Sequence, residues 1–225
     1  MTAHLEPDLV AQRMSDAGLP PDTLTTRRTA LPAAVQDLHR RVLTVIADTG
    51  RPPTGPALAA DAEALGVDLV GALAALAQAE LLFVTHDRVL GGVPFAAAST
   101  AHQVSVHGGP TVSANCAVDA LGVGAMFRRD SDVRSVDPLS GEPITAFQRG
   151  SHWTWHPADT VVFVGSSGDG TITDACCPVI NFFSNADNAL EYQRRHGLKG
   201  EVLSMPEAAR AGALVFGDLL AEPTP

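Results

Sequence analysis

The sequence predicts an α+β protein in which a winged-helix-like three-helix domain precedes a mixed α+β domain. Apolar residues spaced for amphipathic helices, followed by a short strand–turn–strand, occupy the first part of the chain. Beyond Gly91-Gly92-Val93-Pro94, strands and helices follow one another without an internal repeat. We therefore divide the chain into an N-terminal arm over residues 1–30, a winged-helix-like domain over 31–93 and an α+β domain over 94–225.

The helical signal is clearest after the arm. Apolar residues recur there at steps of four and three and predict a helix that ends near Gly50: they are Leu31, Val35, Leu38, Val42, Val45 and Ile46. Two shorter helices are predicted over Pro56–Leu65, closed by Gly66, and over Asp68–Ala79. A strand pair then flanks His86-Asp87-Arg88. Within the arm, a helix over Pro7–Ala17 that stops at Gly18 is expected to pack on the body of the protein.

Three helices followed by a hairpin raise a DNA-binding hypothesis, which the residues oppose. The third helix contains no Lys or Arg between Val67 and Gln78. A recognition helix needs side chains that contact bases and phosphates. The formal net charge of −10 also opposes phosphate binding. We therefore expect this domain to be a packing scaffold with no nucleic-acid partner.

The second half of the chain alternates strand and helix signals. Strands are predicted at 103–107, 133–136, 144–147, 160–164 and 180–183. A helix is predicted over Ala186–Arg195, stopped by Gly197, and a last helix opens with the capping box Ser204-Met205-Pro206-Glu207 and runs towards Leu220. Trp153-Thr154-Trp155 is also strand-like, which places His152 and His156 on one sheet face.

Composition restricts the cellular setting. Hydrophobic residues make up 45% and charged residues 18% of the chain, a globular rather than a disordered mixture. No apolar run approaches the roughly 18 residues that a membrane span needs, and the N-terminus lacks a secretory pattern. Three cysteines, two of them adjacent, do not suggest a disulfide framework. We expect a cytoplasmic protein with reduced thiols and no membrane partner.

Two short segments hold all three cysteines. Asn115 is a suitable N-cap for a helix that begins at Cys116, where the helix dipole favours a thiolate. Asp119 lies three residues later on the same helical face. Cys176 and Cys177 follow about sixty residues further on. If the fold brings the segments together, thiols and a proton carrier share one site.

Such a set of groups suits chemistry on a soft metal. Thiolates prefer cations such as Hg(II), Cu(I) or Zn(II), and a coordinating thiol gives up its proton. A nearby carboxyl can accept that proton and deliver it again. For a substrate R–Hg⁺, two thiolates would weaken the carbon–mercury bond and a proton on carbon would release R–H.

The motif Cys116-Ala-x-Asp119-Ala-Leu, with Cys176-Cys177 before Phe182-Phe183, resembles the organomercurial lyases, also called alkylmercury lyases. The resemblance covers roughly residues 31–220. It implies that Cys116 and Cys176 hold mercury, that Asp119 shuttles the proton, and that Cys177 is an ancillary, non-essential cysteine. It also implies that residues 94–225 form the catalytic domain, that Hg(II) is a product and no cofactor is needed, that external small thiols remove the metal, and that a mercuric reductase receives it.

The sequence departs from the family at several positions. Asn115 stands where many members carry an aromatic residue, which bears on the substrate pocket. A structural cysteine that some members have between the two segments is absent around Asp137. Pro178 and Ile180 replace histidines of some members. These differences leave the triad intact and leave the choice of organomercurial open.

Other interpretations remain beside this one. Cysteines are often simply buried, so Cys176 and Cys177 also fit a core. His152 and His156 lack a nearby third ligand, which favours a structural role over zinc. A soft-metal sensor or carrier would use the same thiols without turnover, and a family member recruited to a different thiol-based reaction is a further alternative.

Overall fold

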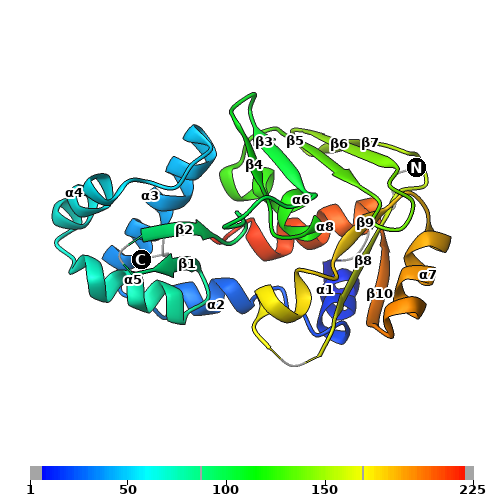
Figure 1. The fold of residues 1–225 in the computed structure, drawn as a ribbon, viewed down its shortest axis with the longest axis horizontal. Coiled ribbons are helices and arrows are strands. Elements are labelled where there is room, and N and C mark those ends of the chain that lie inside the picture. Colours follow the sequence, from blue (N-terminus) through cyan, green and yellow to red (C-terminus); the bar gives the residue numbers. More distant parts are fainter. Residues whose placement is uncertain (1–6, 87, 169, 221–225) are drawn as a thin grey trace.

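The computed structural model describes residues 7–86, 88–168 and 170–220 and shows a mixed α+β protein (Figure 1). Two helices, α6 (Ala117–Phe127) and α8 (Met205–Phe216), pack against each other and lie between the sheets. They approach closely because both contribute glycine: a Cβ built on Gly212 would lie 2.8 Å from the backbone nitrogen of Gly122. The α+β prediction is confirmed.

The N-terminal arm contains two helices, α1 (Pro7–Asp16) and α2 (Thr23–Thr29). The first was predicted and is followed by Gly18 in the left-handed region, with φ of 82°. The second was not predicted, because its Thr-rich and Arg-rich sequence lacks an apolar period. Val10 and Met14 of α1 are buried, and both arm helices contact α8.

The next segment contains the three predicted helices and the predicted strand pair. They are α3 (Ala33–Thr49), α4 (Gly55–Leu65), α5 (Leu69–Gln78), β1 (Leu82–Thr85) and β2 (Arg88–Gly92). β1 and β2 pair antiparallel. Left-handed Gly50 and Gly66 end α3 and α4, as the sequence indicated.

The larger sheet is antiparallel throughout and has the order β4-β3-β5-β6-β7. Its strands are β3 (Gln103–Val106), β4 (Thr111–Ser113), β5 (Ser131–Val136), β6 (Pro143–Arg149) and β7 (His152–His156). α6 packs against β3 and β5. In β7, His152 and His156 are exposed while the two tryptophans face the core, so the predicted alternation is confirmed.

The smaller sheet has the order β10-β8-β9 and supports the second cysteine segment. Its strands are β8 (Val161–Ser166), β9 (Asn181–Phe183) and β10 (Lys199–Ser204), with the π-helical turn η1 (Ile172–Cys176) between β8 and β9, and α7 (Ala186–His196) before β10. β10 was not predicted, because Lys199-Gly200-Glu201 is polar and only pairing with β8 makes it a strand. The capping box of Ser204 and Glu207 is present, and α8 ends at Phe216, short of Leu220.

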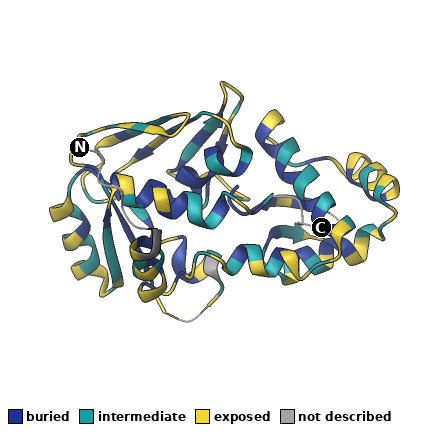
Figure 2. Ribbon diagram, turned by 180° about the vertical axis from the view of Figure 1, so that it is seen from behind, coloured by how far each residue is buried: buried dark blue, intermediate teal, exposed yellow. Residues whose placement is uncertain are grey.

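One cluster of buried apolar side chains extends from Val10 in the arm to Leu219 after α8. Figure 2 shows buried residues along the inner strands and α6, whereas α4 and α7 expose most of their residues. Both cysteine segments belong to this cluster. Within the described ranges, no helix has the length and apolar character to cross a bilayer.

Candidate active site

The first cysteine segment forms the start of α6. Cys116 is the N-cap, with φ of −151°, and its Sγ accepts a hydrogen bond from the backbone N–H of Asp119 at 3.3 Å. The predicted helix is therefore present, but its cap is Cys116 itself and not Asn115. The N–H of Ala117 donates to the carbonyl of Ile180 at 3.2 Å, which joins the start of α6 to the second cysteine segment.

Three buried side chains converge at this junction. The Sγ atoms of Cys116 and Cys177 and a carboxylate oxygen of Asp119 all lie within 4.8 Å of one another. The Cys177 thiol donates to Oδ2 of Asp119 at 3.9 Å. Within the described part of the chain, no other group of three Cys, His, Asp or Glu side chains has a geometry that could hold a metal ion.

Cys176 is adjacent in sequence but lies outside this cluster. Its side chain is also buried, with 6% exposure, and its thiol contacts Ser166 at the end of β8. Cys176 is the last residue of η1 and Cys177 lies in the turn that follows, so the two side chains point in different directions and only that of Cys177 reaches Cys116 and Asp119. The sequence-based expectation paired Cys116 with Cys176, whereas the structure brings Cys177 to Cys116 and Asp119.

Burial controls the protonation of all three groups. It raises the pKa of Asp119 to about 7, against hydrogen bonds from Asn115, Cys116 and Cys177 that lower it. Burial also raises the pKa of Cys116 well above its ordinary value, and the neighbouring Cys177 and Asp119 add to the effect.

For Cys177, a hydrogen bond with Cys116 lowers the pKa, but burial and the proximity of Asp119 outweigh it and the net pKa is raised. The helix dipole led us to expect a thiolate at Cys116, but the raised pKa favours the protonated thiol in the resting protein. The backbone N–H at the helix start does lower the pKa of Cys116, but by less than burial raises it. Both thiols are protonated near neutral pH, beside a carboxyl that titrates there.

Two cavities meet at Cys177. The inner cavity, which we call the chamber, has a volume of about 50 Å³. Besides Cys116, Asp119 and Cys177, it is lined by Met14, Leu19, Pro20, Thr23, Leu24, Val93, Val118, Ile180 and Val215. The outer cavity, which we call the cleft, has a volume of about 520 Å³ and includes Cys177 but neither Cys116 nor Asp119 in its lining.

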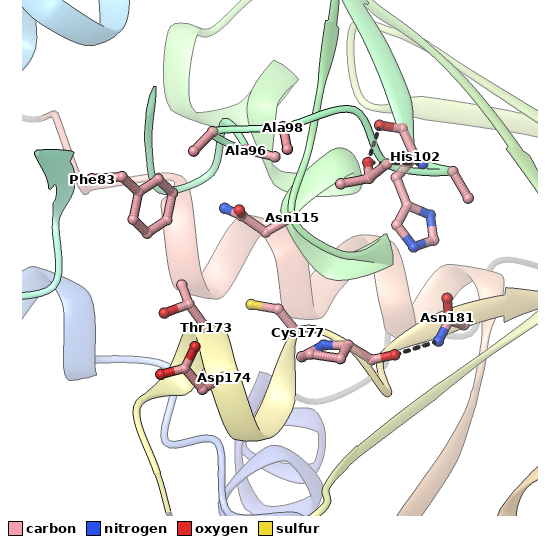
Figure 3. Close-up of a pocket in the computed structure, with 13 residues that line it drawn as sticks. Phe83, Ala96, Ala98, His102, Asn115, Thr173, Asp174, Cys177 and Asn181 are labelled. Atoms are coloured by element: carbon pink, nitrogen blue, oxygen red, sulfur yellow. Dashed lines mark hydrogen bonds between the residues drawn. The ribbon is translucent and has the colours of Figure 1, made fainter. Parts of the chain in front are cut away.

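The cleft combines small apolar and polar side chains. Phe83, Ala96 and Ala98 lie on one side, and the Cys177 sulfur and the Asn115 amide face the same space (Figure 3). Asn115 donates to the carbonyl of Pro94 at 3.0 Å and also hydrogen-bonds the Asp119 carboxyl. Sequence reasoning gave Asn115 a place in the substrate pocket but missed its contact with Asp119.

The histidines that lie near the cleft or were considered as metal ligands do not belong to the group formed by Cys116, Asp119 and Cys177. His102 lines the cleft, but its Nδ1 lies 3.0 Å from Ser135 Oγ and burial lowers its pKa to about 4, so it is a neutral, hydrogen-bonded side chain. Neither His152 nor His156 belongs to a group of three metal-binding side chains in the described ranges.

A pair of thiols and a carboxyl, buried at the meeting point of an apolar chamber and an open cleft, has the ligand types that a soft metal prefers beside a group that can carry a proton. The family model for alkylmercury lyase (MerB) matches residues 95–217, more than half of the chain. The chain therefore belongs to the alkylmercury lyase family, and it is a lyase.

A solved structure supports the fold. The chain resembles a crystal structure described as the mercury-bound form of MerB2, with a TM-score of 0.74 and 22% identity, over 89% of this chain and 98% of that one. At this identity the likeness concerns the fold. Comparison with curated protein sequences gives no significant match.

Proposed function

We propose that this protein cleaves carbon–mercury bonds by protonolysis, with Cys116 and Cys177 holding mercury and Asp119 carrying the proton. The observation that supports this most strongly is the convergence of the two sulfurs and the carboxylate within 4.8 Å. Family membership supplies the reaction class, and the lyases of this family use no cofactor and release Hg(II) as a product.

The positions of the two cavities suggest an order of events. Cys177 lines both cavities, whereas Cys116 lines only the chamber. An organomercurial that enters as a thiol adduct, R–Hg–SR′, therefore meets Cys177 first. The Cys177 sulfur bonds to mercury, the Hg–SR′ bond breaks, and the thiol proton leaves with R′SH.

The second thiol then completes the cleavage. Cys116 bonds to mercury and passes its proton to the carboxylate of Asp119, which delivers it to the carbon as the Hg–C bond breaks. The products are R–H and Hg(II) held by two sulfurs. The raised pKa of Asp119, about 7, suits a group that both accepts and donates a proton near neutral pH.

Hydrocarbon release from methylmercury and from phenylmercury, with excess small thiol, tests this proposal, and the adjacent cysteines supply a matched control. We expect Cys116→Ser and Cys177→Ser to abolish hydrocarbon release and Cys176→Ser to retain most of it. Loss of activity in Cys176→Ser with retention in Cys177→Ser would restore the pairing implied by the family resemblance. Stoichiometric mercury uptake by the unaltered protein, without hydrocarbon release from either methylmercury or phenylmercury, would indicate a sensor or carrier.

We propose that small thiols, and then a mercuric reductase, receive the Hg(II) product. We also propose that the protein acts in the cytoplasm in mercury detoxification, since its three cysteines are free thiols and thiols stay reduced in that compartment.

Residues 31–93 are proposed to be a winged-helix-like domain that covers the catalytic domain over 94–225 without binding DNA. Phe83 of β1 supports this role because it lines the cleft. Binding of duplex DNA at low salt would count against it.

A further inference from the structure

The N-terminal arm, residues 7–30, forms part of the wall of the chamber. Five of the side chains that line the chamber come from it, namely Met14, Leu19, Pro20, Thr23 and Leu24. Met14 and Leu24 are buried, with 1% and 4% exposure. The arm lies outside the segment that the family model matches, residues 95–217, so the catalytic groups and much of the surrounding wall come from different parts of the chain.

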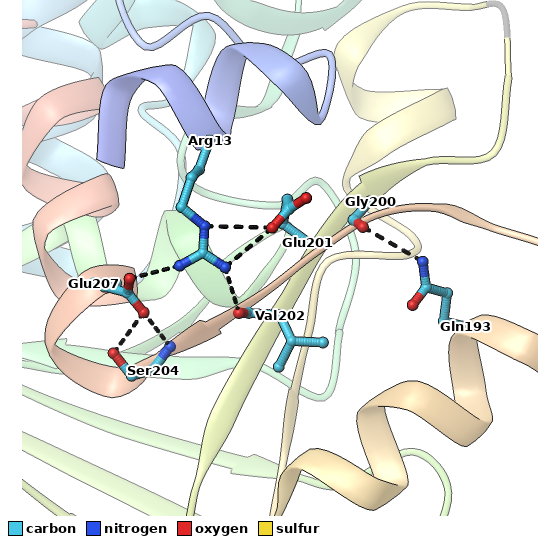
Figure 4. A network of polar contacts seen from close by, with 7 residues as sticks. All are labelled: Arg13, Gln193, Gly200, Glu201, Val202, Ser204 and Glu207. Carbon is cyan, nitrogen blue, oxygen red and sulfur yellow. Dashed lines mark hydrogen bonds and ion pairs between the residues drawn. The ribbon is translucent and has the colours of Figure 1, made fainter. Parts of the chain in front are cut away.

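The arm is held on the catalytic domain by a specific polar contact. The guanidinium of Arg13 pairs with Glu201 at 3.1 Å and Glu207 at 2.5 Å, and donates to the carbonyl of Val202 at 2.8 Å (Figure 4). These acceptors lie on β10 and in the first turn of α8. Met14 is the next residue of α1, so this contact anchors the helix that carries Met14 on β10 and α8.

The volume of the chamber limits what it can hold. An engineered apolar cavity of about 150 Å³ holds benzene, and the chamber, at about 50 Å³, has a third of that volume. A methyl-sized group fits beside the two sulfurs, but a phenyl ring requires the arm side chains to move or to be smaller.

The larger cleft cannot hold the carbon that receives the proton, so the size limit of the chamber still applies to that carbon. Proton transfer needs the donor within hydrogen-bond reach of the acceptor, about 3 Å. Asp119 lines the chamber and not the cleft. The carbon that is bonded to mercury, and the atoms attached directly to it, therefore lie in the chamber.

We propose that the N-terminal arm selects the organic group by size, with Met14 and Leu24 as the specificity-determining residues. This inference rests on the proposed function. It assigns to a segment outside the matched domain the choice between small alkyl and aryl substrates.

The test compares kcat/KM for phenylmercury and methylmercury in variants that enlarge the chamber. We expect Met14→Ala to raise the phenyl-to-methyl ratio about tenfold or more, since one methylene in an apolar pocket changes discrimination by about 10- to 200-fold. Leu24→Val removes a single methylene and keeps the test informative if Met14→Ala fails to fold. The control is Leu9→Ala on α1, whose side chain is 54% exposed and which should leave the ratio unchanged.

The outcomes separate the two proposals. Hydrocarbon release with an unchanged ratio in folded Met14→Ala or Leu24→Val would overturn the role of the arm and leave the lyase proposal standing. A change in the ratio in Ala98→Leu, which narrows the cleft and leaves the chamber unchanged, with none in the arm variants would place the organic group in the cleft and also overturn the inference. Absence of hydrocarbon from the unaltered protein with both substrates would overturn the proposed function itself, and the inference with it.

Discussion

The buried carboxyl of Asp119 should make the unliganded protein less stable at alkaline than at acidic pH. The folded state raises its pKa from 3.8 to about 7, so the folded protein binds this proton more tightly than the unfolded chain does. Its contribution is therefore favourable below pH 4, declines as the pH rises from 4 to 7, and is lost above 7. The full difference corresponds to about 4 kcal/mol, an upper value because a buried site can relax when it ionises.

Replacement by asparagine removes this titration while keeping the shape of the side chain. We expect Asp119→Asn to abolish hydrocarbon release and, at about pH 8, to gain up to about 4 kcal/mol in unfolding free energy relative to the unaltered protein. At about pH 4 the difference should be small or reversed. Urea unfolding of the reduced, mercury-free proteins at both pH values measures it.

Asp137 provides a control of opposite sign. Burial would raise the pKa of Asp137, but hydrogen bonds from Asn188, Ser184, Leu139 and Ser140 outweigh it and the net pKa is lowered. Asp137 thus stabilises the protein above the unfolded pKa and loses this effect as the pH falls. Asp137→Asn should destabilise the protein at about pH 8 and less so in acid. If the difference in unfolding free energy between Asp119→Asn and the unaltered protein did not change with pH, the raised pKa assigned to Asp119 would be refuted.

Two further predictions concern packing. Arg13→Gln removes two ion pairs that are partly buried and should lower the unfolding free energy by about 1–2 kcal/mol, measured by urea unfolding. The control Arg129→Gln removes an ion pair that is about half exposed and should change the unfolding free energy by less than about 0.5 kcal/mol. Equal effects of the two substitutions would contradict a stabilising role of the Arg13 contacts that hold the arm. Gly122→Ala should cost about 1–3 kcal/mol despite the better helix propensity of alanine, because its Cβ would collide with the ring of Phe216. A neutral Gly122→Ala in a thermal or urea unfolding assay would show that α6 and α8 can move apart.

Local pattern was sufficient for much of the architecture. The apolar spacing of residues 31–46 determines α3, the capping box at Ser204 determines the start of α8, and alternation determines β7. The proximity of Cys116 and Asp119 is also local, because residues three apart share a helical face. The family resemblance rests on these short motifs, and the match to the alkylmercury lyase model confirms it.

Only the tertiary structure decided which sulfur faces Asp119 and how the site is protonated. Cys176 and Cys177 are equivalent in a sequence pattern, and the rotation of the turn after η1 against α6 directs Cys177 inward and Cys176 towards Ser166. The raised pKa of Asp119 and the size of the chamber depend on burial by the arm, Val93, Ile180 and Val215 of α8, which are distant in sequence. Residue spacing determines neighbours within one helix or strand, whereas burial and side-chain direction at a junction depend on how several elements pack, and no local pattern contains that information.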